Sequence, residues 1–367
     1  MDLEPRVSWD LAAMLLLAGL AAGCAGSSET ASVDDPTPWP VTAFPDRPEI
    51  MNDVPEARIE LGRLLFFDPI LSVDDQTACV TCHSELWGMG DGIARAIGHS
   101  AGLDAGPRRK GPNTLRRNSQ ALYNLAFRSS LLWDGREDSL EEQVLVPLFS
   151  EVEMGADEET VLGELSGIPE YVVRFADAFP EDPRVSVENM ASAIAAFQRT
   201  FISDRSSYDA YAEGRHELMN EDEVEGMFRF AEMGCDDCHT PPLFESETFA
   251  NRKLPEVEGI VDQGLEEHTG LLEDRAKFRT PTLRNLASTE PYFHNGSFKS
   301  MFDAIRHELE QGAMPFTEDD VQLIARFIDK TLRDETRNPI RPRAVPSGLP
   351  LPIDPAGPAS IGGGDGL

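Results

Sequence analysis

The sequence predicts a mostly α-helical protein of two domains, and three observations lead to this fold class. Apolar residues recur at helical spacing in several segments, and long alternating strands are absent. The pattern Cys-x-x-Cys-His occurs twice, once in each half of the chain. With 367 residues, 41% of them hydrophobic, the chain is long enough for two domains that each have a core.

The N-terminal region has the features of an export signal. Residues 11–22 (LAAMLLLAGLAA) form an apolar run too short to span a bilayer. This run leads into AAGC at 21–24, which resembles the lipobox of bacterial lipoproteins, where the cysteine is lipidated after cleavage. We therefore expect a lipoprotein signal over 1–24 with an anchor at Cys24. An ordinary signal peptide is the alternative, because Ala21 stands where Leu is usual and the first ten residues are acidic.

The first domain is expected over 49–203, after a flexible linker. Residues 25–48 are polar and rich in proline, which is typical of a tether. Asp53 and Pro55 can start a helix that Asp68-Pro69 ends, and this helix leads to the first Cys-x-x-Cys-His string. Helical spacing of apolar residues predicts a closing helix over 186–202.

The second domain is expected over 204–337, after a boundary at 204–214. A helix over about 221–233 again leads to a Cys-x-x-Cys-His string. Thr317 with Asp320 can cap a last helix. The apolar face of this helix includes Val321, Ile324 and Ile328. The chain from 338 to 367 is rich in Pro and Gly, which predicts a disordered tail.

The two Cys-x-x-Cys-His strings have the spacing of c-type haem attachment, in which both thiols form thioethers and the histidine binds the iron. They consist of Cys79, Cys82 and His83, and of Cys235, Cys238 and His239. A zinc half-site or a redox dithiol could explain one string, but two strings that use every cysteine except Cys24 favour haem. We therefore expect two cytochrome c-like helical domains, each with one covalent haem c. Attachment of this cofactor outside the inner membrane supports a periplasmic location.

The net charge of −33 limits the choice of partners. So acidic a surface repels nucleic acid and anionic membranes. It favours a basic protein partner or a neutral small substrate.

Several segments resemble the bacterial diheme cytochrome c peroxidase family, which includes the diheme maturation enzyme of methylamine utilisation. They lie in the family's order within about residues 55–332. The matching segments are LGRLLFFDPILSVDDQTACVTCH at 61–83, RNSQALYNLAF at 117–127, LLWDGREDSLEEQVLVPLFSEVEMG at 131–155, SSYDAYAEG at 206–214 and FRTPTLRNLASTEPYFHNGSF at 278–298.

The resemblance implies roles for the two haems and for a catalytic pocket. The haem on His83 would react with peroxide, and the haem on His239 would take electrons from a donor. Glu153 falls at the position of the family's catalytic carboxylate, which moves a proton between the peroxide oxygens. Gln143 and Pro147 match residues that line the same pocket, with Gln143 as a hydrogen-bond donor to peroxide. Trp133 matches the tryptophan between the haems.

The resemblance leaves the sixth iron ligands open. His99 resembles the displaceable distal ligand of the peroxidatic haem, although about ten extra residues follow it. If His99 is no ligand, that haem is open at rest. At the second haem the family places Met or Tyr where this chain has Glu308, preceded by His307. Met301 and Met314 are near in sequence.

A calcium ion between the domains is also implied. Asn118, Thr289 and Pro291 match the family's calcium ligands, which are the oxygen donors that this ion prefers. His294 matches a histidine close to the haems, where it would form a hydrogen bond. Family members often dimerise, so a homodimer is a further expectation.

The function predicted from these residues is the reduction of hydrogen peroxide to water with electrons from a small donor, such as a basic cytochrome c. One alternative is an enzyme that uses the same haems to oxidise a partner protein or another substrate. The other is a diheme electron carrier without catalysis. Glu153, Gln143 and the WDGR string argue against the carrier, because a carrier needs no acid–base pocket. A Met or His sixth ligand at the second haem favours the peroxidase, and an oxygen ligand favours the partner-oxidising branch.

Overall fold

The computed structural model describes residues 37–354, except 43, 258, 335, 337 and 338. The described chain is mostly helical, as predicted. Its α-helices are α1 (Glu56–Phe67), α2 (Cys79–Cys82), α3 (Leu140–Phe149), α4 (Glu158–Gly167), α5 (Pro169–Ala178), α6 (Val187–Gln198), α7 (Ser207–Ala212), α8 (Glu221–Glu232), α9 (Glu266–Thr269), α10 (Met301–Gln311) and α11 (Glu318–Thr331). A short antiparallel pair, β1 (Phe249–Ala250) and β2 (Phe278–Arg279), joins Phe249 to Arg279 and Ala250 to Phe278. The predicted signal peptide and the anchor at Cys24 lie outside the described residues.

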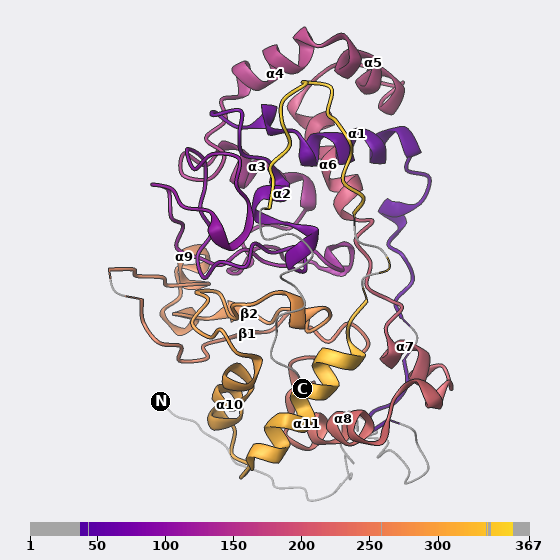
Figure 1. Ribbon diagram of the computed structural model, residues 1–367, viewed down its shortest axis with the longest axis vertical. Coiled ribbons are helices and arrows are strands. Elements are labelled where there is room, and N and C mark those ends of the chain that lie inside the picture. Colours follow the sequence, from indigo (N-terminus) through magenta and orange to yellow (C-terminus); the bar gives the residue numbers. More distant parts are fainter. Residues whose placement is uncertain (1–36, 43, 258, 335, 337–338, 355–367) are drawn as a thin grey trace, which may run out of the picture.

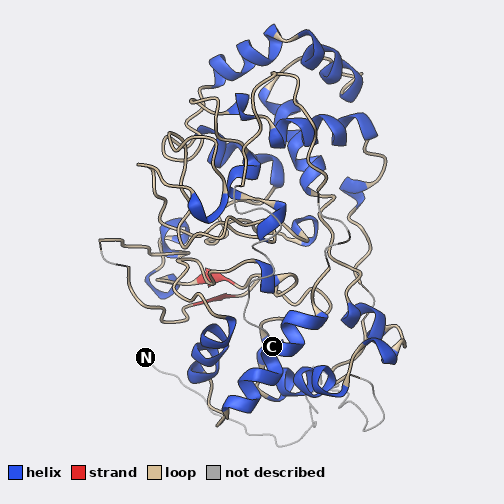
Figure 2. Ribbon diagram, in the orientation of Figure 1, coloured by secondary structure: helices blue, strands red, loops and turns tan. Residues whose placement is uncertain are grey.

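Two groups of helices form the two ends of an elongated molecule (Figure 1). Helices α1 to α6 lie at one end and α7, α8, α10 and α11 at the other, with loops and the β1–β2 pair between them (Figure 2). Each end has its own apolar core. One core is formed by residues between Leu61 and Phe201 together with Val345, and the other by Trp39 and residues between Tyr208 and Leu332.

Each core contains one very close helix crossing at a glycine. In the first domain α1 crosses α6 at Gly62, where a Cβ atom would lie 1.9 Å from the carbonyl oxygen of Ala193. In the second domain α8 crosses α11 at Gly226, where a Cβ would lie 2.1 Å from the carbonyl oxygen of Leu323. The two helices that lead into a Cys-x-x-Cys-His string, α1 and α8, are thus in close backbone contact with the last helix of their domain, α6 and α11.

The four helices expected from apolar spacing and caps are confirmed, with ends within a few residues of the prediction. Helix α6 begins after Ser186, whose hydroxyl accepts a hydrogen bond from the Asn189 amide. Helix α11 begins with the predicted capping box. The Asp320 carboxylate accepts from the Thr317 amide at 2.7 Å, and the Thr317 hydroxyl accepts from the Asp320 amide at 3.3 Å.

The expected flexible linker over 25–48 is wrong for the part that the structure describes, residues 37–42 and 44–48. Trp39 is only 7% exposed and belongs to the core of the second domain. Phe44 packs edge-to-face on Phe127 of the first domain, with ring centroids 5.4 Å apart. Polar and proline-rich composition favoured a tether, but two isolated aromatic side chains are enough to attach this segment to both domains.

The expected disordered tail is wrong for residues 339–354, which pack on the first domain. Val345 is 5% exposed and belongs to its core. Arg341 forms an ion pair with Glu85 at 2.9 Å, and the Ser347 hydroxyl donates to the buried Asp68 carboxylate at 2.7 Å. The tail therefore returns from the second domain and covers the first, next to the chain that follows His83. The proline content of this segment indicates an extended backbone, and in the structure this extended backbone packs on the first domain.

We expect that removing residues 339–367 destabilises the first domain by about 3 kcal/mol or more. Burial of one large aliphatic side chain contributes roughly 1.5–3 kcal/mol, and the truncation exposes the core around Val345 and leaves the buried Asp68 without its Ser347 partner. Urea unfolding of the holoprotein measures the change. Removal of residues 355–367 alone is the matched control, and equal midpoints for both truncations would contradict the prediction.

Candidate functional site

The first Cys-x-x-Cys-His string holds its histidine by two backbone carbonyls. Cys79 and Cys82 are the first and last residues of α2, and His83 follows directly. The His83 Nδ1 lies 3.0 Å from both the Met89 and the Gln120 carbonyl oxygens, so this nitrogen carries the proton and donates. Burial lowers the pKa of His83. The ring is therefore neutral, and its Nε2 keeps a lone pair for a metal.

The second string repeats this arrangement. The His239 Nδ1 lies 3.2 Å from the Phe244 carbonyl oxygen and 3.1 Å from that of Pro281. Burial lowers the pKa of His239 to about 4, so this ring is also neutral, with Nε2 available. A carbonyl that orients the second nitrogen of a metal-binding histidine is a common feature of metal sites. The histidines of both strings are thus oriented as proximal haem ligands are.

The two domains meet through reciprocal contacts. The Asn118 amide donates to the His294 carbonyl at 2.7 Å, and the Arg279 amide donates to the Trp133 carbonyl at 2.8 Å. Gly135 and Gly296 both have positive φ, and each approaches the other domain so closely that a Cβ atom would lie 2.4 Å from Phe249 or 2.3 Å from Ala94. The WDGR and FHNG turns are therefore equivalent parts of the two halves, and each reaches across the junction.

A cavity of about 910 Å³ lies beside the second string. It is lined by Cys235, Cys238 and His239, by the inner face of α10, and by the junction residues Trp133 and His294. Arg279 also lines it and is 1% exposed, but its Nε and Nη2 have no hydrogen-bond partner within the described chain. Its Nη1 donates to the neighbouring Thr280 carbonyl at 3.2 Å. A buried guanidinium with two of its three nitrogens unpaired is costly, and burial lowers its pKa to about 9. A porphyrin carboxylate would provide the missing anion, so this cavity fits a haem.

Polar groups without partners also mark the first domain. The Gln143 Oε1 and the Gln120 Nε2 are buried and have no partner among the described residues. The Gln120 carbonyl is one of the two that orient His83, and Gln143 lies one helical turn before Pro147 on α3. These groups fit a polar ligand beside a haem on His83.

Glu153 lies on the turn that follows α3. The Met154 amide donates to the Pro147 carbonyl at 3.1 Å, which folds this turn back on the end of the helix. Burial raises the pKa of Glu153, while the Ser150 hydroxyl and the charge of Arg136 lower it. The structure therefore brings Glu153 close to Pro147, in surroundings that raise the pKa of a candidate proton-transfer group.

His99 is held against the same turn. Its amide donates to the Glu153 carbonyl at 2.7 Å, and its ring Nε2 lies 2.9 Å from the Glu151 carbonyl oxygen. Its Nδ1 lies 2.7 Å from the Ser100 hydroxyl oxygen. Both ring nitrogens thus have protein partners, and binding to an iron requires that the bond to Glu151 break. The role of His99 as a distal ligand stays a prediction.

Trp133 and His294 lie at the domain junction. The Trp133 indole donates to the Asn118 carbonyl at 2.9 Å, and its ring packs edge-to-face on His294 with centroids 6.3 Å apart. His294 stacks on Phe278 with centroids 3.5 Å apart, and burial lowers its pKa to about 4. Trp133 belongs to the first domain but lines the cavity of the second, as a residue between two haems would.

The structure separates the two candidates for the sixth ligand of the second haem. Glu308 lines the cavity, whereas His307 lies on the next face of α10. The His307 ring packs on Phe298, and its Nε2 donates to the Arg252 carbonyl at 2.8 Å. Met301 and Met314 also line the cavity, although Met314 is 51% exposed.

The three residues expected to bind calcium lie on loops that meet at the junction. The contact between Asn118 and His294 brings the loop of Asn118 to that of Thr289 and Pro291. The Asn118 side-chain amide donates to the Ile93 carbonyl at 2.7 Å, and the Thr289 hydroxyl donates to the Leu286 carbonyl at 3.0 Å. Calcium binding itself stays a prediction.

Sequence reasoning missed three charged residues of these sites. Arg279 and Arg252 line the cavity, and Arg136 acts electrostatically on Glu153. A single arginine in a loop carries no sequence signal of its own. Only the WDGR string, which contains Arg136, could have indicated one of them.

Asp91 is a buried carboxyl that we expect to make stability depend on pH. It is 2% exposed, and burial raises its pKa to about 7, although the Ile93 amide and the Ser119 hydroxyl donate to it. Between pH 4 and pH 7 the unfolded chain loses this proton and the folded chain keeps it, so stability falls as pH rises through this range. We expect Asp91→Asn to flatten the slope, measured as the melting temperature from pH 5 to pH 8. The exposed Asp177→Asn is the control, and an unchanged slope in Asp91→Asn would refute the prediction.

In the part of the chain that the structure describes, no helix is long and apolar enough to cross a membrane.

Comparison with known proteins identifies the family. Residues 56–217 match the model of the di-haem cytochrome c peroxidase family. The chain is 33% identical over 319 residues to cytochrome c551 peroxidase of Pseudomonas aeruginosa, covering 84% of this chain and 87% of the relative. It is 31% identical over 262 residues to methylamine utilization protein MauG of Methylorubrum extorquens, covering 71% of each. The crystal structure of a MauG-like protein associated with microbial copper homeostasis is 27% identical, with a TM-score of 0.68, over 81% of this chain and 95% of that one. The chain therefore belongs to the di-haem cytochrome c peroxidase family and is an oxidoreductase with two c-type haems.

Proposed function

We propose that this protein reduces hydrogen peroxide to water, with electrons that enter at the haem on His239 and pass to the haem on His83. The observation that carries the proposal is Glu153, a half-buried carboxyl of raised pKa on the turn after α3, which folds back on Pro147 of the helix that also carries Gln143. The haems, when bound, supply the redox chemistry by accepting electrons and passing them to peroxide.

In this proposal Glu153 transfers a proton, and Gln143 orients the peroxide by hydrogen bonding. Cleavage of the O–O bond requires a proton to move from the inner to the outer peroxide oxygen, and Glu153 in its ionised form can take and return it. The Gln143 amide provides both a donor and an acceptor. Its buried carbonyl oxygen has no partner among the described residues, so it can accept a hydrogen bond from a peroxide hydroxyl and orient it.

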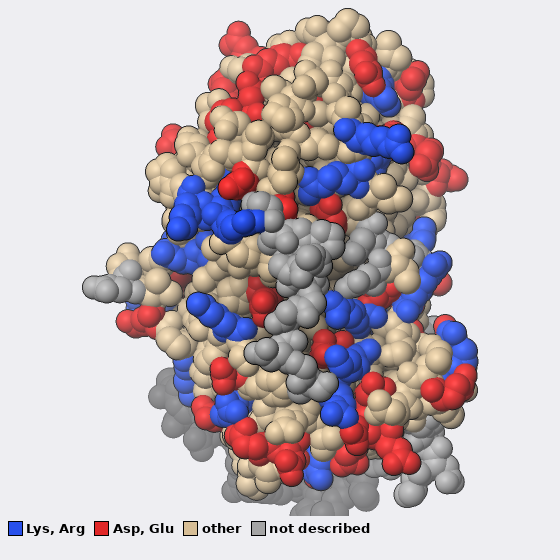
Figure 3. Space-filling view, viewed as in Figure 1, with Lys and Arg blue, Asp and Glu red and all other residues tan. Residues whose placement is uncertain are grey.

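The charge of the protein supports a small basic protein, such as a cytochrome c, as the electron donor. Acidic side chains gather at the lower end of the molecule, where α8 and α11 lie (Figure 3). The first turns of these helices carry Glu221, Asp222, Glu223, Glu318, Asp319 and Asp320. These charges belong to the domain of His239, so they would attract a cationic donor to the haem at which electrons enter.

Oxidation of a partner protein is the second candidate function, and one observation favours it. At the sixth-ligand position Glu308, not His307, lines the cavity, which gives an oxygen side chain where the peroxidases of the family have Met. The relatives also include proteins named for methylamine utilization.

The proposal has four further parts. They are export to the periplasm, a lipid anchor at Cys24, a homodimer, and a calcium ion on Asn118, Thr289 and Pro291. The first two rest on the apolar run and AAGC string of the N-terminus, and the calcium ion rests on the meeting of the two loops. A fall in melting temperature when EGTA is added, reversed by excess calcium, is the result that the calcium proposal requires.

The test of the main proposal is peroxide-dependent oxidation of a reduced basic cytochrome c by the haem-loaded protein. We expect turnover that saturates in peroxide and slows as salt screens the acidic surface. If both haems are intact and reducible but no turnover occurs, the peroxidase proposal fails and oxidation of a partner protein remains.

A further inference from the structure

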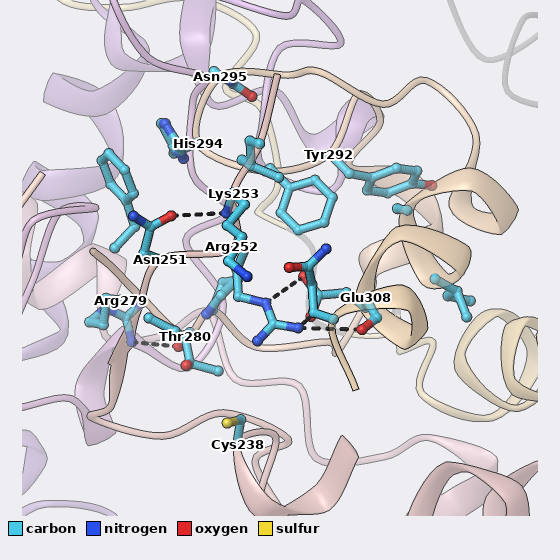
Figure 4. A pocket seen from close by; sticks show the side chains of 18 of the residues that line it. Cys238, Asn251, Arg252, Lys253, Arg279, Thr280, Tyr292, His294, Asn295 and Glu308 are labelled. Carbon is cyan, nitrogen blue, oxygen red and sulfur yellow. Dashed lines mark hydrogen bonds and ion pairs between the residues drawn. The ribbon is translucent and has the colours of Figure 1, made fainter. Parts of the chain in front are cut away.

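An arginine–glutamate pair lies inside the cavity of the second domain. Arg252 follows β1 and Glu308 projects from α10, and both line the cavity with Cys235, Cys238 and His239 (Figure 4). The Arg252 Nε donates to the Glu308 Oε1 at 3.0 Å, and the Arg252 Nη2 pairs with the Glu308 Oε2. This bidentate pair occupies both oxygens of the carboxylate.

The pair keeps part of its hydrogen-bonding capacity. The Nη1 group of Arg252 has no hydrogen-bond partner within the described chain, so its two N–H groups can donate to a ligand. The side chains of Arg252 and Glu308 are 35% and 33% exposed. A guanidinium on the wall of a cavity is suited to a small anion or another hydrogen-bond acceptor.

Four other side chains near this cavity could bind an iron strongly. Three of them, His294, Met301 and Met314, line the cavity, but each of the four has other contacts or is half exposed. The His307 Nε2 donates to the Arg252 carbonyl, and the His294 ring lies flat on Phe278. Met301 packs against the apolar core, and Met314 is half exposed beyond the end of α10. A carboxylate held by a guanidinium is itself a weak ligand, because the positive charge lowers the electron-donating strength of both oxygens.

We propose that the haem on His239 lacks a strong sixth ligand in this protein and that the Arg252–Glu308 pair forms a binding site for a small ligand of the peroxide or cyanide class. Arg252 donates a hydrogen bond to the bound ligand, and Glu308 holds the guanidinium in place. This site goes beyond the role of this haem in accepting electrons from a donor, because a carrier haem with two strong ligands leaves no room for a third group.

Binding of carbon monoxide to the dithionite-reduced holoenzyme tests the open position. Wild type should bind one equivalent more than Glu308→Met, in which a thioether can occupy the iron. This difference does not depend on the state of the haem on His83. Glu308→Gln, which keeps the shape of the side chain, should bind as much carbon monoxide as wild type.

Cyanide binding to the oxidised holoenzyme tests the role of Arg252. In Arg252→Leu the cyanide affinity of this haem should fall about tenfold or more, because the anion loses a charged donor. Carbon monoxide is neutral, and its affinity should change less than twofold. Arg275→Leu is the matched control, since Arg275 lines the same cavity but is 58% exposed and pairs with Glu266 at 3.6 Å. It should bind both ligands as wild type does.

Three outcomes would overturn the inference. The first is equal carbon monoxide stoichiometry in wild type and Glu308→Met. The second is that Met301→Leu or Met314→Leu binds one equivalent of carbon monoxide more than wild type does, which would show that a thioether occupies the iron of the wild-type protein. The third is equal loss of cyanide and carbon monoxide affinity in Arg252→Leu. None of these measurements depends on turnover, so they are separate from the test of peroxidase activity.

Discussion

Replacing Glu153 by Gln is expected to lower kcat for peroxide-dependent cytochrome oxidation by about 10²–10⁴-fold, the usual contribution of a positioned acid–base group. The amide keeps the size of the side chain but cannot take a proton from peroxide. Burial raises the pKa of Glu153, and the ionised form is the one that accepts the proton. Wild-type activity should therefore fall as pH decreases through this raised pKa, and the variant should lose this dependence. Steady-state kinetics from pH 4.5 to pH 8 measure both effects.

Glu151→Gln is the matched control for this experiment. Glu151 lies on the same turn and is exposed, and the turn uses its carbonyl rather than its carboxylate to bind His99. We expect its kcat to stay within about twofold of wild type. Unchanged haem spectra and melting temperature in both variants exclude misfolding. A Glu153→Gln enzyme with wild-type kcat and pH profile would show that another group moves the proton.

Replacing Trp39 by Ala is expected to destabilise the second domain by about 3–5 kcal/mol, the usual cost of removing a large aromatic side chain from a core. The Trp39 ring packs against Tyr208, Phe230, Phe244 and Phe327, with centroids 6.0–6.4 Å apart. Its indole donates to the Tyr208 hydroxyl at 2.9 Å. Guanidinium unfolding of the holoprotein, followed by circular dichroism, measures the loss.

Two further variants define what the Trp39 result means. Val41→Ala changes a side chain in the same segment that is 47% exposed, and we expect less than about 0.5 kcal/mol. Trp39→Phe keeps an aromatic ring but loses the hydrogen bond, so an intermediate cost is expected. If Trp39→Ala unfolds like wild type, residues 37–48 are a tether, as their composition suggested.

The sequence predicted much of each domain because the relevant signals are local. Helices α1, α6, α8 and α11 follow from caps and apolar spacing, which act within a few residues. The haem-binding residues can be identified from the Cys-x-x-Cys-His strings alone, since both cysteines and the histidine lie within five consecutive positions. Glu153, Gln143 and Trp133 were found only through the resemblance, because a single glutamate, glutamine or tryptophan has no pattern of its own.

The resemblance could not decide the surroundings of Glu308. It placed Glu308 and His307 side by side as candidate ligands. On a helix, consecutive side chains point about 100° apart, so two neighbours need not face the same cavity. The packing of His307 on Phe298 shows which one does.

The sequence by itself determined the helical class, the two haem attachment sites and the order of the domains. Only the tertiary structure decided that the two ends of the chain cross over, with Trp39 in the core of the second domain and Val345 in that of the first. It also decided that Arg252 pairs with Glu308 and that Arg279 is buried beside the second attachment string. The physical reason is that these contacts join residues far apart in the chain. Their energy depends on the path of the folded backbone, and no local periodicity encodes that path.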